Sequence, residues 1–169
     1  DYVHYPIRME RTRTRAKEKP ADAGEDYKTE YETYNEWETL NSMVPLWQRN
    51  KKDVTDEEYD AFYREKFFDY EKPICHLHLS VEGAVTYKAL LYVPGRAPYD
   101  FYTKDYKKGL QLYSSGVLIM ENCEDLLPDH FRFVRGIVDS QDLSLNISRE
   151  MLQHNRQLTF IAGNLEKKI

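Results

Sequence analysis

Two runs of alternating apolar residues meet at a glycine in residues 74–94, ICHLHLSVEGAVTYKALLYVP. Apolar side chains recur at every second position on both sides of Gly83. Alternation of this kind places the apolar side chains on one face of a strand, and a glycine between two such runs favours a reversal of the chain. The pattern predicts an antiparallel hairpin with one buried face.

A helix is predicted before this hairpin, in residues 54–67, VTDEEYDAFYREKF. Thr55 is a good N-cap residue, and Glu58 follows it three positions later, which is the spacing of a capping box. Four aromatic residues recur at helical spacing and are expected in the core: Tyr59, Phe62, Tyr63 and Phe67.

Three further elements are predicted after the hairpin. They are a strand in residues 109–122 that is interrupted at Ser114-Ser115-Gly116, a strand in residues 132–140, and a helix in residues 148–169. The order helix, hairpin, strands, helix predicts an α/β layered sandwich with a mostly antiparallel or mixed sheet. We expect this compact domain to occupy residues 40–169.

The first 39 residues differ in composition from the rest. Residues 1–19 are rich in Arg and Lys, residues 20–38 are rich in Asp and Glu, and the turn-prone stretch PADAGED lies between them. Two polar strands of opposite charge predict a β-hairpin. Because an isolated two-stranded hairpin is marginal in water, a charged linker without regular structure is an equally weighted alternative.

Composition narrows the classes of protein. The chain has 169 residues, of which 41% are hydrophobic and 31% charged, and this is typical of a globular domain. A net charge of -5 argues against nucleic-acid binding, which needs a basic face. No apolar run approaches the length that spans a membrane. Cys75 and Cys123 lie far apart, as expected for reduced thiols in the cytoplasm.

His76 and His78 share one face of a predicted strand, so a metal site is conceivable. Neither cysteine has metal-ligand spacing, and no Cys or carboxylate cluster joins the two histidines. We therefore expect no metal, and we expect these histidines to be solvated.

Hydrogen-bonding side chains crowd into residues 139–157, DSQDLSLNISREMLQHNRQ, around the start of the last predicted helix. The N-terminus of a helix favours an anion, and Arg149 could offer a planar fork to a phosphate or a carboxylate. Alternatively, Asn146 and Ser148 only cap the helix while Arg149 pairs with Asp142. From the residues alone, the chain reads as an α/β interaction module.

Several segments carry a resemblance to a known family. They are VPLWQRNKKDVTDEEYDAFYREKF, SVEG at 80–83, LLYVPGRAPYDFY, RFVRGIVDSQDL and VDSQDLSLNISREMLQ, which keep their order over residues 40–168. Together they resemble the ninety-kilodalton heat-shock chaperones, in their bacterial form. HYPIRM resembles the last strand of that family's N-terminal ATPase domain.

The resemblance implies the second domain of a GHKL-type ATPase, an α/β sandwich with a left-handed β-α-β crossover. It implies the linker and the first part of the middle domain of an ATP-dependent, homodimeric, cytoplasmic chaperone that binds non-native client proteins. ATP with Mg would bind the N-terminal domain of the full-length protein and not this chain. The full-length chains would pair through a C-terminal domain. Neither nucleic acid nor a membrane is an expected partner.

The resemblance also assigns residues. Arg149 matches the arginine that contacts the γ-phosphate of ATP, and Asn146 and Gln153 match its neighbours in the catalytic loop. Trp47 matches a tryptophan associated with client contacts and domain coupling, although packing at a domain edge is the alternative. Many members have a basic residue near positions 114–116, where this chain has Ser-Ser-Gly. A stand-alone interaction module without catalysis remains the competing hypothesis.

Overall fold

The computed structural model describes residues 5–17, 29, 31–41, 43–98, 100–143 and 156–169. The chain divides into two compact units, Asp1–Val44 and Pro45–Ile169. Each unit is a separate body with its own contacts, and each is described below by itself.

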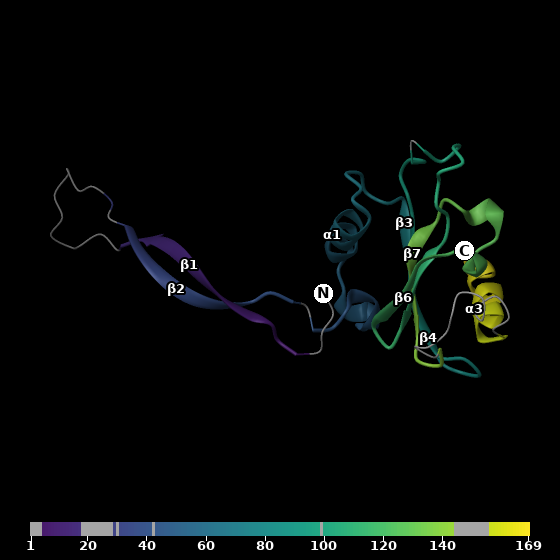
Figure 1. Cartoon of the computed structure of the whole chain (residues 1–169), viewed down its shortest axis with the longest axis horizontal. Coiled ribbons are helices and arrows are strands. Elements are labelled where there is room, and N and C mark those ends of the chain that lie inside the picture. Colours follow the sequence, from purple (N-terminus) through teal and green to yellow (C-terminus); the bar gives the residue numbers. More distant parts are fainter. Residues whose placement is uncertain (1–4, 18–28, 30, 42, 99, 144–155) are drawn as a thin grey trace. The chain divides into compact units, whose positions relative to one another are not determined.

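Unit 1 is an antiparallel hairpin of β1 (Arg8–Ala16) and β2 (Tyr31–Thr39), shown in purple and blue (Figure 1). The register runs without a break from Arg8 opposite Thr39 to Ala16 opposite Tyr31. Beyond the open end, the side chain of Asn41 accepts from the backbone N–H of Ile7, at 2.8 Å. The predicted β-hairpin is confirmed, and the alternative of a linker without regular structure is wrong for these strands.

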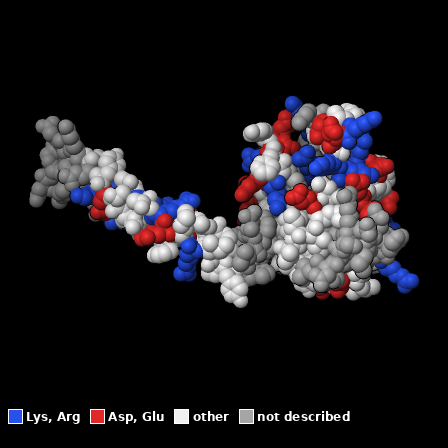
Figure 2. Space-filling model, viewed as in Figure 1, with Lys and Arg blue, Asp and Glu red and all other residues white. Residues whose placement is uncertain are grey.

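Ion pairs line one face of this hairpin. Arg15 Nε lies 2.5 Å from a carboxylate oxygen of Glu32 directly opposite, and its guanidinium lies over the ring of Tyr34. Figure 2 shows basic and acidic side chains interleaved along the strands. The other pairs on this face join Arg11 to Glu38 and Arg13 to Glu36 and Glu38. Opposite charges therefore attract each other across the two strands in this register.

Unit 2 is built on a five-stranded sheet with the order β3-β4-β7-β5-β6. The strands are β3 (Cys75–Val81), β4 (Tyr87–Val93), β5 (Leu110–Ser114), β6 (Val117–Cys123) and β7 (Arg135–Ser140). β5 runs parallel to β7, and the other neighbours are antiparallel. The predicted α/β class with a mostly antiparallel, mixed sheet is confirmed. The handedness of a β-α-β crossover stays a prediction.

Helices lie on opposite sides of this sheet (Figure 1). On one side is α1 (Asp56–Phe67), which begins with the predicted capping box of Thr55 and Glu58. On the other side is α3 (Arg156–Glu166), which buries Leu158, Ile161 and Leu165 in the main core. Four 3₁₀ turns complete the described elements: η1 (Leu46–Gln48), η2 (Lys51–Asp53), η3 (Glu124–Leu126) and η4 (Asp129–Phe131).

The prediction of one buried face is wrong for β4. Ala89 and Leu91 belong to the core cluster that α3 joins, and Tyr92 packs against Tyr63 of α1. Leu90 is fully buried as well. The reason is that a helix covers each face of the sheet, so no face of this inner strand reaches water.

Residues 109–122 are not one interrupted strand. They form the hairpin of β5 and β6, closed by a two-residue turn at Ser115 and Gly116. Both turn residues have positive φ, 50° and 81°, as a tight primed hairpin turn requires. The predicted interruption at Ser114-Ser115-Gly116 is therefore the turn itself.

Candidate functional site

The three predicted catalytic residues, Arg149, Asn146 and Gln153, lie in residues 144–155, outside the described residues. Ser148, the expected cap of the last helix, lies there too. Leu143 and Arg156, the first residue of α3, flank this segment. The roles of the four residues stay predictions.

The chain that leads into this segment is held by three hydrogen bonds. Ser140 Oγ donates to the carbonyl of Thr86 at 2.8 Å, and the backbone N–H of Thr86 donates to Asp142 Oδ2 at 2.6 Å. Ser114 Oγ donates to the carbonyl of Leu143 at 2.6 Å, in a buried position. We call residues 140–143 the loop root. Hydrogen bonds thus join the loop root to Thr86, directly before β4, and to the end of β5.

Trp47 lies in η1 and is fully buried in unit 2. Its ring centroid is 5.0 Å from that of Tyr113 and 6.0 Å from that of Phe62. Its indole Nε1 donates to Asp139 Oδ2 at 2.9 Å. The ring is therefore part of the interior, and a role in client contact or domain coupling would have to act through the groups it touches.

Asp139 is a functional candidate that sequence reasoning missed. It lies near the end of β7, is 5% exposed, and also accepts hydrogen bonds from Gln48 Nε2 and the Gly116 backbone N–H. One signal could have identified it. The residue is a carboxylate directly after the apolar pair Ile137 and Val138, within the strand predicted in residues 132–140.

The two histidines are not equivalent, and the expectation that both are solvated is wrong for His78, which is 7% exposed. Its Nε2 lies 3.1 Å from the carbonyl of Trp47, and its Nδ1 lies 2.7 Å from the hydroxyl of Tyr59. A carbonyl only accepts, so Nε2 carries the proton and Nδ1 accepts from the phenol. His76 stacks on the Tyr59 ring at 4.0 Å between centroids.

Burial sets the ionisation of this pair. Desolvation lowers the pKa of His78 below its ordinary value, and desolvation raises the pKa of Tyr59. Both groups are therefore neutral near pH 7. Within the described ranges, no group of three or more His, Cys, Asp or Glu residues could hold a metal ion. Cys75 is exposed, Cys123 is buried, and the two are not joined by a disulfide bond.

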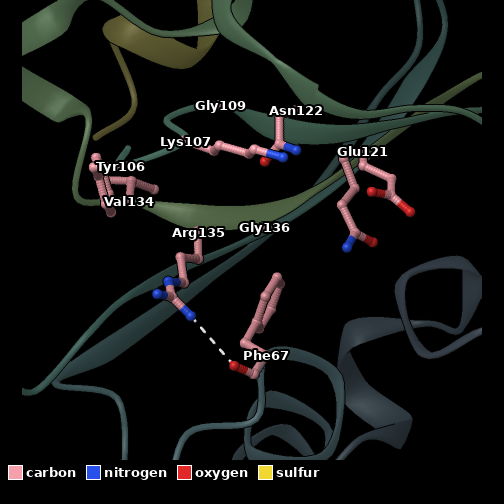
Figure 3. A pocket seen from close by; sticks show the side chains of 10 residues that line it. Phe67, Tyr106, Lys107, Gly109, Glu121, Asn122, Val134, Arg135 and Gly136 are labelled. Carbon is pink, nitrogen blue, oxygen red and sulfur yellow. Dashed lines mark hydrogen bonds between the residues drawn. The ribbon is translucent and has the colours of Figure 1, made fainter. Parts of the chain in front are cut away.

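A polar cavity of about 220 Å³ opens where β7 passes the end of α1 (Figure 3). Arg135 Nη1 donates to the carbonyl of Phe67 at 3.3 Å across it. Tyr106, also in the lining, donates its hydroxyl to the carbonyl of Arg132 at 2.9 Å, and burial raises its pKa. The described lining contains no Ser, Thr, Cys or His side chain.

Across the described part of the chain, no helix combines the length and the apolar character needed to cross a membrane. The family model described as Hsp90 protein matches residues 2–169.

The chain belongs to the heat-shock protein 90 family.

The chain is 57% identical to the chaperone protein HtpG of Clostridium perfringens and to that of Clostridium botulinum, in each case over 169 residues and 100% of this chain. The chain spans 26% of the length of these relatives. A solved structure, the middle domain of a Plasmodium falciparum heat shock protein, matches 72% of this chain and 45% of its own chain, with 29% identity and a TM-score of 0.58. Unit 2 thus has the α/β fold of a heat-shock protein 90 middle domain, and the chain is of the bacterial HtpG type.

Proposed function

We propose that this chain serves as the middle segment of an ATP-dependent chaperone and supplies Arg149 to ATP held by an N-terminal domain. The observation that carries the proposal is the 57% identity to chaperone HtpG, which extends over the whole chain. That match includes the stretch VDSQDLSLNISREMLQ, on which the family resemblance was first based. We further propose that the segment contributes to the binding of non-native client proteins.

The chemistry of the proposal follows from the guanidinium of Arg149. A planar, permanently charged fork can donate two hydrogen bonds to phosphoryl oxygens, and its charge offsets the negative charge that develops during transfer. Asn146 and Gln153 would hold the neighbouring backbone and phosphate oxygens by neutral hydrogen bonds. The N-terminal domain would bind ATP with Mg. The same domain would supply the carboxylate that acts as general base.

The rest of the proposal concerns organisation and partners. Residues 1–39 would be the end of the N-terminal domain with the charged linker, and residues 40–169 the large part of the middle domain. The partners would be client proteins, the chaperone's own N-terminal ATPase domain, and a second copy bound through a C-terminal domain. The chaperone would work in the cytoplasm.

The test replaces Arg149 in a full-length chaperone that carries this segment. A second full-length protein for the test is Clostridium perfringens HtpG in which the matching segment is replaced by this chain. Arg149→Ala should lower the turnover number for ATP on the order of 10²- to 10³-fold, the usual cost of removing one charge-stabilising donor. Arg156→Ala is the matched control, since Arg156 is an exposed arginine at the start of α3.

The KM for ATP should stay nearly constant in Arg149→Ala, because nucleotide binding belongs to another domain. Wild-type turnover in this variant, or a loss of turnover that follows a loss of folding, would show that the catalytic assignment is wrong.

A second function, an interaction module without catalysis, is favoured by one specific observation. Exposed aromatic side chains follow α1, where Phe68 is 89% exposed and Tyr70 is 98% exposed. Exposed apolar side chains of this kind offer a surface for contact with a partner. If Arg149→Ala keeps wild-type turnover while Phe68→Ser with Tyr70→Ser weakens binding of an unfolded protein, this second function is the better description.

A further inference from the structure

Three segments of unit 2 meet at the carboxylate of Asp139. Oδ2 accepts from Trp47 Nε1 and from Gln48 Nε2, both at 2.9 Å, and Oδ1 accepts from the backbone N–H of Gly116 at 3.2 Å. Trp47 stands 92 residues before Asp139, and Gly116 stands 23 residues before it. One side chain thus connects η1, the β5–β6 turn and the end of β7.

A carboxylate suits this position for a physical reason. An ionised Asp only accepts hydrogen bonds, with lone pairs on two oxygens, so it can satisfy three converging donors at once. The three donors are neutral groups, and charge-assisted bonds to them offset the cost of burying the anion. An Asn side chain at this position would turn an NH₂ group towards at least one of the donors. A buried donor without an acceptor is costly, so Asn cannot hold all three segments.

A second contact ties η1 to the sheet at the same level. Lys88 of β4 is the direct cross-strand partner of Asp139. Its Nζ donates to the carbonyl of Gln48 at 2.8 Å. The 3₁₀ turn that carries Trp47 is therefore held by two adjacent strands, through its side chains to β7 and through its backbone to β4.

In the chain, Asp139 lies directly before the loop root. Ser140 follows Asp139 in the chain, and the β5–β6 hairpin end that donates to Asp139 through Gly116 also donates to Leu143 through Ser114. A displacement of Trp47 would therefore displace Asp139 and the end of the β5–β6 hairpin together. Both of these groups hold the chain where it leaves β7.

We propose that Asp139 is a positioning residue that links Trp47 to the loop root and so fixes the direction in which the chain leaves β7. The inference rests on the proposed function of Arg149. The direction of the chain after β7 affects ATP turnover only because Arg149 lies further along that chain. Asp139 touches no substrate in the proposal. It acts through the backbone of residues 140–143.

The first test is Asp139→Asn in the full-length host, which keeps the shape of the side chain. Turnover of ATP should fall roughly 2- to 30-fold, the range that residues along a coupling network typically show. The KM for ATP should stay unchanged. The matched control is Tyr106→Phe, which removes one hydrogen bond to the carbonyl of Arg132 in another part of unit 2. It should leave turnover unchanged at a temperature well below the melting point of both variants.

The second test uses Trp47→Phe, which removes the indole donor to Asp139 together with part of the ring that packs against Tyr113 and Phe62, and leaves Asp139 itself unchanged. This variant should also lower turnover. The double variant should be no slower than Asp139→Asn alone, because both changes interrupt one connection. If the two effects multiply as independent changes, or if Trp47→Phe has wild-type turnover, the link is overturned.

The outcomes separate this inference from the proposed function. If Arg149→Ala has wild-type turnover, the proposed function fails. If Arg149→Ala is slow while Asp139→Asn turns over at the wild-type rate and only melts earlier, the proposed function stands, and Asp139 is purely structural.

Discussion

The two units of this chain are both built on antiparallel pairing, but they are stabilised differently. Every residue of β1 is exposed, and the hairpin is held by backbone pairing and surface ion pairs. In unit 2, α1 and α3 cover the two faces of the sheet, and the central strands are buried. Cross-strand charge can therefore select a register, whereas a buried core supplies most of the stability.

The largest expected difference between the units comes from matched leucines. Leu112 is fully buried in unit 2, and Leu40 in unit 1 is 46% exposed. Leu112→Ala should cost about 2–5 kcal/mol of unfolding free energy, because it removes buried contacts and leaves a cavity. Leu40→Ala should stay within about 0.5 kcal/mol.

The two tryptophans allow the units to be followed separately, since Trp37 lies in unit 1 and Trp47 in unit 2. Urea unfolding in a Trp37→Phe background isolates the fluorescence of Trp47 and measures Leu112→Ala, and unfolding in a Trp47→Phe background isolates the fluorescence of Trp37 and measures Leu40→Ala. Equal costs for Leu112→Ala and Leu40→Ala would contradict the contrast between the two units.

A change of pH should have an intermediate effect on thermal stability, and this effect should be confined to unit 2. The folded pKa of His78 is lowered by burial, so the unfolded chain binds the proton first as the pH falls. The stability contributed by neutral His78 is present above the unfolded value of about 6.5 and is lost as the pH falls from there towards the lowered folded value. Thermal melting between pH 8 and pH 5 should show this decline.

His78→Gln should flatten the decline, even though it also lowers the melting point by removing two buried hydrogen bonds. The slope against pH is the quantity to compare. An equal slope with and without His78 would assign the pH dependence to other groups.

The smallest effect is expected from a single ion pair of the hairpin. A double-mutant cycle of Arg15→Ala and Glu32→Ala should give a coupling of about 0.2–1 kcal/mol, as exposed pairs do. The coupling should fall at about 1 M salt, where the Debye length is near 3 Å. Amide exchange across β1 and β2 measures it. A coupling that does not change with salt would show that contacts other than the Arg15–Glu32 ion pair, such as Arg15 over the ring of Tyr34, hold the register.

Much of the fold could be predicted because it depends on short-range patterns. Thr55 and Glu58 mark the start of α1 by their spacing alone, and the capping box is present. The hairpin of β3 and β4 follows from alternation on either side of Gly83. The sequence predicts only an interruption where the β5–β6 turn lies, because the serines before Gly116 do not by themselves require positive φ.

The candidate site was predicted less completely. The sequence indicated the segment that contains Arg149 and singled out Trp47, but it gave no sign that Trp47 contacts Asp139. Such a contact joins residues 92 positions apart, and no periodicity within one element reports it. His78 was expected in water for the same reason, since the groups that enclose it, Tyr59 and Trp47, come from other segments.

The sequence by itself determined the family, the opposite charges of the two hairpin strands, the capped start of α1 and the alternation of β3. These features depend on residue type and on spacing within a few positions, which a single chain displays directly. Only the tertiary structure decided that both faces of β4 are covered, that His78 is neutral and enclosed, and that Asp139 joins η1 to the end of β7. The reason is physical: burial and hydrogen bonding across a sheet depend on which distant segments pack together, and packing is a property of the folded whole.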